Sequence, residues 1–288
     1  MSVKLSSGHS IPVLGYGTGT AWFTGKNESR NDTLVGALAD AIKLGCRHID
    51  AAEMYGTEAD VGRAIKAAGV PRDQLFITTK VFANAADCRT ALKSSLQRMD
   101  LSYVDLYLIH APFFKEKGIP TTLQEVWPIM ESLVSEGLTR SIGVSNFRLS
   151  DLQSLLSFAK INPAANQIEY HPYLQQVDLI SYCLKNHIVI ESYSPLAPIN
   201  LCPGGPVDSL VADLAKKYRR SASQVLLQWN IQKGCVVVTT SRHESRLKEY
   251  LQLVREPFAL SESEMRAIDE AGAKKPFRKY WPKEFGDV

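Results

Sequence analysis

The chain has 288 residues and a mass of 31.9 kDa, and 45% of its residues are hydrophobic, 22% charged and 9% aromatic. These fractions are typical of globular proteins and exclude disordered, collagen-like and coiled-coil architectures. Lys and Arg number 33 against 30 Asp and Glu, and this net charge of +3 is too small to indicate a nucleic-acid-binding or membrane-surface protein. The length fits either two domains of ~150 residues or one larger α/β barrel.

The five cysteines lie far apart and form no Cys-x-x-Cys pair, so the sequence predicts neither a disulfide scaffold nor a zinc ribbon. We interpret them as reduced thiols of a cytoplasmic protein. The chain contains no run of ~18 apolar residues and no signal-peptide-like start. We therefore expect neither a membrane span nor export.

Short β-type runs alternate along the chain with longer helical segments. First, residues 3–5 and 11–13 flank a Ser-Ser-Gly-His turn and predict a hairpin that would close one end of a barrel. Eight nearly continuous apolar runs follow and predict strands that are buried on both faces. These runs are residues 14–18, 46–51, 75–81, 104–110, 139–144, 164–168, 188–192 and 234–238.

Capping motifs and glycines mark the expected helix boundaries between these strands. Pro128 falls inside one helical stretch and predicts a kink or a late helix start there. The expected capping boxes are Thr122 with Glu125, Ser150 with Gln153, Ser221 with Gln224, and Ser261 with Glu264. The expected helix ends are at Gly45, Gly137 and Gly272.

Eight strand–helix units give about 36 residues per unit, which predicts one (β/α)8 TIM barrel domain over residues 1–288. A doubly wound sheet would have Gly-x-Gly-x-x-Gly between its first strand and helix. Here the glycines after the first strand are Gly15, Gly17 and Gly19, and this spacing does not match. We therefore favour the single barrel.

Four polar residues follow three neighbouring predicted strands. Asp50 and Tyr55 follow the second strand, Lys80 ends the third, and His110 ends the fourth. Functional groups of a barrel gather at these carboxyl ends. A buried lysine also needs an anionic partner, which Asp50 would supply. Taken singly, Asp50 could cap a loop and His110 could be a core histidine, but together the four predict a site.

This set of groups suits proton transfer to a carbonyl oxygen. A phenol has a pKa near 10, and a nearby ammonium group lowers that pKa, while a neutral imidazole donates a second hydrogen bond. Neither Gly-x-Ser-x-Gly nor His-Glu-x-x-His is present, so proton donation coupled to hydride transfer fits better than hydrolysis. A metal-dependent hydrolase using His110, His171 and Asp50 is a disfavoured alternative, and we expect no metal ion.

Three stretches carry a resemblance to a known family. They are residues 45–65, which include His-Ile-Asp-Ala-Ala-Glu-Met-Tyr-Gly, residues 140–147, and residues 166–172 with the later Tyr-Ser-Pro-Leu at 193–196. Their sequence and order over nearly the whole chain resemble the aldo-keto reductases. The chain is most similar to the fungal branch that reduces conjugated polyketones, keto lactones and α-keto amides.

The resemblance implies an NADPH-dependent reductase of aldehydes, ketones or α-dicarbonyl compounds. Tyr55 would donate the proton, Lys80 and Asp50 would tune Tyr55, and His110 would orient the carbonyl. Tyr193 would stack on the nicotinamide ring. The implied cofactor contacts are Gly19, Thr20, Asp50, Ser145, Asn146, Gln167, Tyr193, Ser194, Leu196, Thr240, Ser241, Arg242, Arg246, Glu249 and Tyr250.

The chain departs from the family pattern after the last strand. Thr240 stands where the family commonly has a lysine that meets the adenosine 2′-phosphate. Arg246 matches a downstream family arginine, and Arg242 adds a second guanidinium, a group suited to phosphate recognition. We therefore expect NADPH, with use of NADH left open.

Aromatic side chains near the predicted mouth suggest an apolar pocket for a bulky or cyclic carbonyl compound, with the C-terminal tail beside it. The expected substrate contacts are Trp22, Tyr55, His110, Phe113 and Trp281. We expect a monomer and leave a dimer open. A cofactor-binding sensor or regulatory subunit on the same barrel is the alternative function, because fold does not determine function.

Overall fold

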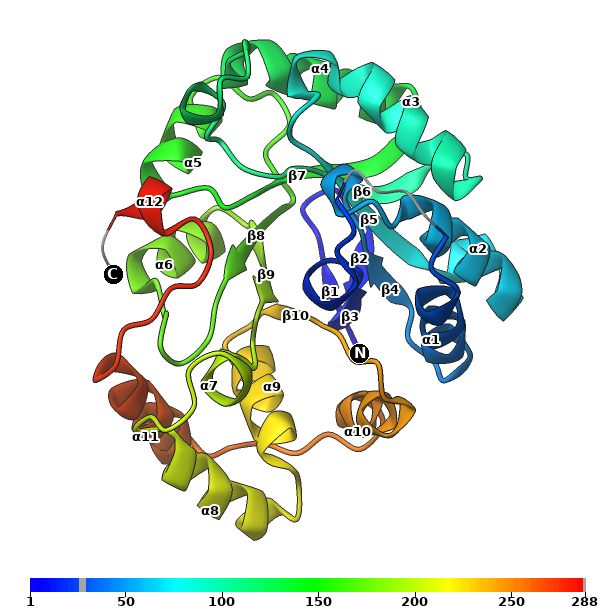
Figure 1. The fold of residues 1–288 in the computed structure, drawn as a ribbon. Helices are drawn as coiled ribbons and strands as arrows, with labels where there is room; N and C mark the ends of the chain where they lie inside the picture. The colour runs from blue at the N-terminus through cyan, green and yellow to red at the C-terminus, as the bar shows by residue number, and fades with distance from the viewer. Residues whose placement is uncertain (26–29, 287–288) are drawn as a thin grey trace.

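The computed structural model describes residues 1–25 and 30–286. Its strands form a closed parallel barrel in the order β10-β3-β4-β5-β6-β7-β8-β9. Helices surround the strands, as Figure 1 shows. The predicted (β/α)8 barrel is confirmed, and the polar residues at the strand ends therefore meet at one end of it.

The strands overlap the eight predicted runs, and two further strands make the N-terminal hairpin. The strands are β1 (Ser2–Lys4), β2 (Ser10–Pro12), β3 (Leu14–Gly17), β4 (His48–Asp50), β5 (Phe76–Val81), β6 (Val104–Ile109), β7 (Thr139–Ser145), β8 (Ala165–Glu169), β9 (Val189–Tyr193) and β10 (Val236–Thr239). The α-helices are α1 (Asp32–Lys43), α2 (Glu58–Ala68), α3 (Cys88–Met99), α4 (Leu123–Ser135), α5 (Leu149–Leu156), α6 (Val177–Lys185), α7 (Ala197–Asn200), α8 (Asp208–Tyr218), α9 (Ala222–Gln232), α10 (Glu244–Arg255), α11 (Glu262–Ala273) and α12 (Pro282–Phe285).

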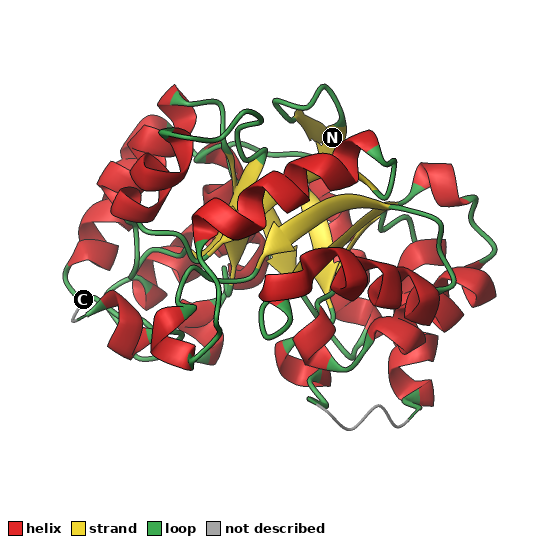
Figure 2. Cartoon of the chain, turned by 90° about the horizontal axis from the view of Figure 1, so that it is seen from above, coloured by secondary structure: helices red, strands yellow, loops and turns green. Residues whose placement is uncertain are grey.

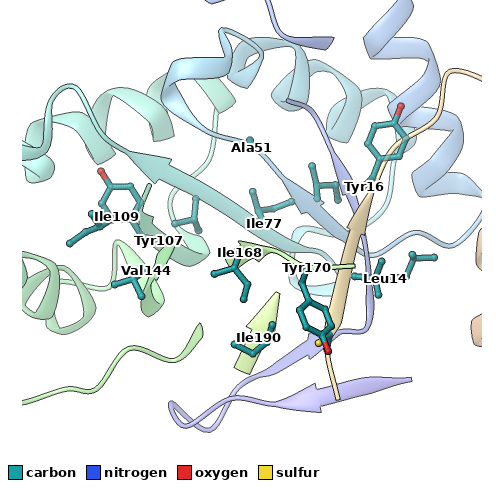
Figure 3. Packing of buried hydrophobic residues seen from close by; sticks show 14 of the residues in the cluster. Leu14, Tyr16, Ala51, Ile77, Tyr107, Ile109, Val144, Ile168, Tyr170 and Ile190 are labelled. Carbon is teal, nitrogen blue, oxygen red and sulfur yellow. The ribbon is translucent and has the colours of Figure 1, made fainter. Parts of the chain in front are cut away.

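The main hydrophobic core lies between the barrel and the helices. Successive side chains of a strand point to opposite faces, so alternate residues of each strand enter this core. Tyr107 and Ile109 of β6 belong to it, together with Ile168 of β8 and Ile190 of β9 (Figure 3). The intervening residues of the same strands point into the barrel.

The hairpin of β1 and β2 closes the amino-terminal end of the barrel. Leu5 and Ile11 of this segment belong to a second, smaller cluster with Leu106 and Val236 from the barrel interior. The Ser7 hydroxyl also hydrogen-bonds to that of Ser141, with 2.7 Å between the oxygens. Figure 2 shows the N-terminus at one end of the barrel, and the expected role of the hairpin is confirmed.

Three of the four predicted capping boxes form, at Thr122, Ser221 and Ser261. The box predicted at Ser150 is wrong, because α5 has its N-cap two residues earlier, at Arg148. There the Asp151 carboxylate accepts hydrogen bonds from the backbone N–H of Arg148, at 2.9 Å, and from its guanidinium. An ion pair therefore replaces the expected hydroxyl cap.

Two other predicted helix boundaries are also corrected. The helix α4 begins at Leu123 and continues through Pro128, so a late start at this proline is wrong. Gly272 lies inside α11 and does not end it. A Cβ at Gly272 would lie 2.0 Å from the carbonyl oxygen of Pro172, so glycine is required there by close packing. Gly45 and Gly137 do follow helix ends, both with positive φ.

Candidate active site

A cavity of about 900 Å³ lies at the carboxyl ends of the barrel strands. Ser145, Gln167 and Tyr193 line it from the ends of β7, β8 and β9. Tyr280 and Trp281 of the C-terminal tail line it as well. The predicted position of the tail at the mouth is therefore confirmed.

Lys80 and Asp50 form a buried ion pair beneath the cavity. The two residues lie on adjacent strands, β5 and β4, and point into the barrel. Lys80 Nζ lies 2.7 and 2.8 Å from the two carboxylate oxygens of Asp50 and donates a further hydrogen bond to the carbonyl of Ala51 at 2.9 Å. The buried lysine thus has the anionic partner that its burial requires.

The Tyr55 hydroxyl lies between the ammonium of Lys80 and the imidazole of His110. Lys80 Nζ is 3.3 Å from the Tyr55 oxygen, and His110 Nε2 is 3.5 Å from it. Tyr55 belongs to a short 3-10 turn, Glu53–Tyr55, that directly follows β4. The structure therefore brings together all four residues that the sequence predicts at the strand ends.

Burial determines the protonation of the phenol and the imidazole. It raises the pKa of Tyr55 well above 10, and the negative charge of Asp50 adds to this rise. The net shift of this pKa is therefore upward, although Lys80 Nζ lies 3.3 Å from the hydroxyl. Burial, assisted by Lys80, lowers the pKa of His110 well below its usual value. At neutral pH the site thus holds a protonated phenol beside a neutral imidazole.

The residues expected at the nicotinamide form a connected network. Asn146 donates from its side-chain nitrogen to the His110 carbonyl at 2.8 Å and accepts from the Tyr193 hydroxyl at 2.8 Å. The Ser145 hydroxyl donates to the backbone carbonyl of Gln167 at 2.8 Å. These hydroxyl and amide groups line the cavity, and they suit a ligand that itself carries a primary amide.

A polar layer that the sequence reasoning missed lies below Gln167. The amide nitrogen of Gln167 donates to Asp50 at 2.8 Å and to Glu191 at 3.2 Å. The Glu191 carboxyl lies 3.8 Å from the imidazole of His48. The signal available in the sequence was a charged residue, Glu191, within the otherwise largely apolar run of residues 188–192. Both amide N–H groups of Gln167 face these carboxyls, so its carbonyl oxygen is directed elsewhere.

Burial shifts the pKa of both groups in this layer. The pKa of Glu191 rises to about 8 through burial and the nearby Asp50, although Lys80 opposes the rise. The pKa of His48 falls to about 4, mainly through burial. Its ring occupies the space beside Gly15, where an added Cβ would lie 2.6 Å from Nδ1. The glycine-rich string after the hairpin therefore makes room for His48.

The opposite part of the cavity carries positive charge. Arg242 and Arg246, near the start of α10, line it together with Ser241 and with Ser194 after β9. Within residues 1–25 and 30–286, neither guanidinium forms an ion pair with a carboxylate. Both charges are thus available to an anionic ligand, and this cavity fits a dinucleotide with an amide at one end and phosphates at the other.

Gly19, Thr20, Leu196 and Thr240 also line the cavity, as the resemblance implies for cofactor contacts. Thr240 accepts a hydrogen bond at 3.0 Å from the indole nitrogen of Trp22. The threonine that departs from the family pattern therefore lies at the cavity wall and is held by an aromatic residue of the first loop.

Four residues predicted to contact cofactor or substrate lie outside the described lining of the cavity. Trp22 is 3% exposed, and Phe113 is fully buried behind Trp281, with 5.3 Å between ring centroids. Glu249 accepts a hydrogen bond from Ser221, and Tyr250 is buried in the main core. Phe23, Met54 and Tyr280 line the substrate side of the cavity, and of these Met54 is the residue that the sequence reasoning did not consider for the pocket.

Within residues 1–25 and 30–286, no group of three or more His, Cys, Asp and Glu side chains is arranged to hold a metal ion. His171, considered above as a metal ligand, instead contacts the Glu169 carboxylate at 3.1 Å. The helices in this part of the chain include none with the length and apolar character of a membrane span.

The comparison with protein families gives one match, described as the aldo/keto reductase family, over residues 13–199. This match covers more than half of the chain and includes Asp50, Tyr55, Lys80 and His110. The chain therefore belongs to the aldo/keto reductase family and is an oxidoreductase.

Two similar curated proteins are fungal. The chain is 42% identical over 268 residues to the NAD/NADP-dependent indole-3-acetaldehyde reductase of Schizosaccharomyces pombe, with 92% of each chain covered. It is 36% identical over 301 residues to the NADPH-dependent alpha-keto amide reductase of Saccharomyces cerevisiae, covering 98% of this chain and 94% of that protein. Among solved structures, an aldo/keto reductase from Brucella melitensis matches with a TM-score of 0.82 and 36% identity, covering 94% of this chain and 99% of the other.

Proposed function

We propose that the protein is a single-domain, NADPH-dependent carbonyl reductase with Tyr55 as its proton donor. Its substrate would be an aldehyde, a ketone or an α-dicarbonyl compound such as a keto lactone, a conjugated polyketone or an α-keto amide. The observation that carries this proposal is the position of the Tyr55 hydroxyl, 3.3 Å from Lys80 Nζ and 3.5 Å from His110 Nε2, at the cavity.

Each of these residues would have its own role in the proposed reduction. Tyr55 and neutral His110 would hold the carbonyl oxygen of the substrate by hydrogen bonds and so orient its carbon for hydride transfer. Bound NADPH supplies the hydride. As negative charge develops on the carbonyl oxygen, Tyr55 donates its proton to it, and Lys80 stabilises the resulting phenolate. Asp50 keeps the ammonium of Lys80 in position.

NADPH fits the residues that line the remaining cavity. Gln167 and Ser145 would bind the carboxamide, and the Tyr193 ring would stack on the nicotinamide. Arg242 and Arg246 would meet the phosphates, including the adenosine 2′-phosphate. The names of the two fungal relatives support this choice, since both include NADP or NADPH. NADH remains the second cofactor to test, because Thr240 stands in place of the usual lysine.

The substrate side of the cavity supports a neutral or aromatic carbonyl compound. Phe23, Met54, Tyr280 and Trp281 line the cavity and offer mostly apolar surface. Among the relatives, one is named for an indole acetaldehyde and another for α-keto amides. These names guide the choice of substrates to test.

The decisive experiment measures oxidation of NADPH against a panel of carbonyl compounds, with wild-type protein and with Tyr55→Phe. The variant should lose activity by about 10²–10⁴-fold, because it keeps the ring and removes the proton. Its dissociation constant for NADPH, measured by fluorescence, should stay near that of wild type. The same panel with NADH gives the cofactor preference.

Equal activity of Tyr55→Phe and wild type would show that the assignment of the proton donor is wrong. Binding of NADPH without reduction of any carbonyl compound would instead favour a cofactor-binding sensor. We also propose a cytoplasmic location, which the five free thiols support, and a monomer. Light scattering would decide between monomer and dimer.

A further inference from the structure

The C-terminal tail contributes residues to the cavity wall that have no role in the proposed proton donation or cofactor binding. After α11 the chain runs past α6 to the short helix α12, as Figure 1 shows. On this path Tyr280 and Trp281 line the cavity. Their positions decide the shape of its substrate side.

A single buried carboxylate holds the tail at this point. Glu169 ends β8 and is 1% exposed. The backbone N–H of Lys279 lies 2.9 Å from one of its oxygens, and the N–H of Tyr280 lies 2.9 Å from the other. His171 Nε2 contacts the first oxygen at 3.1 Å. Hydrogen bonds to a buried, charged acceptor are among the stronger ones in proteins.

We propose that Glu169 is a positioning residue that determines substrate selection by fixing Tyr280 and Trp281 at the cavity. This inference rests on the proposed reductase function. Glu169 belongs to the third stretch that resembles the family, yet it has no place in the proton transfer. Its role follows from its contacts with a segment more than a hundred residues later in the chain.

The aromatic contacts of the tail explain how the anchor reaches the substrate. The Tyr280 ring packs edge-on against Tyr193, with 5.5 Å between centroids. The Trp281 ring packs against Phe82 at 5.6 Å and Phe113 at 5.3 Å. Trp281 also has a φ of +57°, which a tryptophan rarely adopts unless its surroundings hold it there.

Other contacts hold the tail on either side of the anchor. Before it, the N–H of Phe277 donates to the Tyr173 carbonyl at 3.0 Å. After it, Arg148 donates to the Glu284 carbonyl at 3.1 Å. In the described chain, the N–H groups of Lys279 and Tyr280 have no acceptor besides Glu169. Loss of the carboxylate should therefore loosen residues 279–281 without releasing the whole tail.

Glu169→Gln tests this role with the smallest change in shape. One acceptor oxygen becomes an NH₂ group that faces an N–H donor. We expect KM for a bulky aromatic ketone to rise about tenfold. For propanal, which is too small to need the aromatic wall, kcat and KM should change less than about twofold, and so should the dissociation constant for NADPH.

Glu131→Gln is the control for the substitution itself. One oxygen of the Glu131 carboxylate accepts both the N–H of Lys160 and that of Ile161, at 2.7 and 2.8 Å, and the amide oxygen of glutamine can take its place; the residue lies on α4 away from the cavity. This variant should leave the ratio of the two KM values unchanged. A similar change of this KM ratio in both variants would overturn the proposal, since it would reflect general destabilisation.

Trypsin gives a readout that does not depend on activity. Cleavage after Arg278 and Lys279 should be faster in Glu169→Gln than in wild type and unchanged in Glu131→Gln. If no carbonyl compound is reduced, the proposed function fails while this measurement still tests the anchor. Unchanged cleavage and an unchanged KM ratio would overturn the anchor even if the reductase activity is present.

Two further variants keep the test independent of one substitution. Lys279→Pro removes one of the donating N–H groups and leaves Glu169 intact, so it should reproduce the change in selection if Glu169→Gln does not fold. In a Trp281→Ala background, Glu169→Gln should raise KM for the bulky ketone by less than about threefold. If KM still rises tenfold in this background, Glu169 does not act through Trp281.

Discussion

The two ends of the barrel are built from opposite kinds of side chain. At the amino-terminal end, Leu5 and Ile11 of the hairpin segment pack with Leu106 and Leu108 in an apolar cluster. At the carboxyl end, buried polar and charged groups fill the interior. The apolar end needs only shape and volume, whereas the polar end needs every charge paired. Stability and chemistry are therefore assigned to different parts of one barrel.

The polar end depends on a chain of contacts. Lys80 pairs with Asp50, Asp50 accepts from Gln167, and Gln167 donates to Glu191. Removing one member leaves its partner buried without compensation, which is more costly than removing both. Substitutions at the two ends should thus have different effects on stability and on activity.

Lys80→Met should have the largest effect on both properties. It removes the cation that stabilises the phenolate and leaves Asp50 buried and unpaired. We expect kcat to fall at least about 10²-fold and stability to fall by about 3–5 kcal/mol. Stopped-flow reduction and urea unfolding measure the two effects.

The double variant Lys80→Met with Asp50→Asn separates these effects. Neutralising Asp50 should restore most of the lost stability but none of the lost activity. If stability is not restored, the uncompensated charge of Asp50 is not the cause of the loss.

Leu106→Ala should affect stability alone, because Leu106 is fully buried at the apolar end. The expected loss is about 2–5 kcal/mol, from the removed apolar surface and the cavity that remains. The dissociation constant for NADPH should stay within about twofold of wild type. A large change in NADPH binding would show that the two ends are coupled.

Glu191→Gln should have the smallest effect, seen as a change in pH dependence. With a pKa near 8, folded protein binds more protons at Glu191 than unfolded protein does between its ordinary pKa of 4.5 and pH 8. Wild-type stability should therefore fall as pH rises through this range, by on the order of 2 kcal/mol between pH 6 and 8. Thermal unfolding of Glu191→Gln should lack this fall, and Glu131→Gln should retain it.

His48 changes stability with pH in the opposite direction, and it is present in both Glu191→Gln and Glu131→Gln. Its pKa of about 4 lies below the ordinary 6.5, so unfolded protein binds more protons between these values. Stability should therefore decline as pH falls from 6.5 to 4, in Glu191→Gln as in wild type. Loss of this acid decline in the variant would mean that the two groups titrate as one unit.

The fold was predictable from the sequence because each strand gives a strong local signal. Each barrel strand contributes apolar residues to the main core, and Gly45 and Gly137 follow helix ends. One error arose where a distant contact overrides the local pattern. Gly272 looked like a helix end, but its close approach to Pro172 is visible only in three dimensions.

The sequence predicted those residues of the candidate site that lie at the ends of strands. Lys80 and His110 could be placed by this rule, since strand ends meet at one mouth. Trp22 and Phe113 could not, because a loop decides whether an aromatic ring faces a cavity or a core. Glu169 and Glu191 were missed as functional groups because their partners are set by register and by the distant tail.

The closure of the barrel has a consequence for synthesis on the ribosome. The strand β10 pairs with both β9 and β3, so the first and last barrel strands meet only when β10 has been made. Until then β3 and β9 present unpaired backbone edges, which are templates for aggregation. Such non-local pairing also slows folding. The nascent chain therefore exposes both edges until residues 236–239 have emerged.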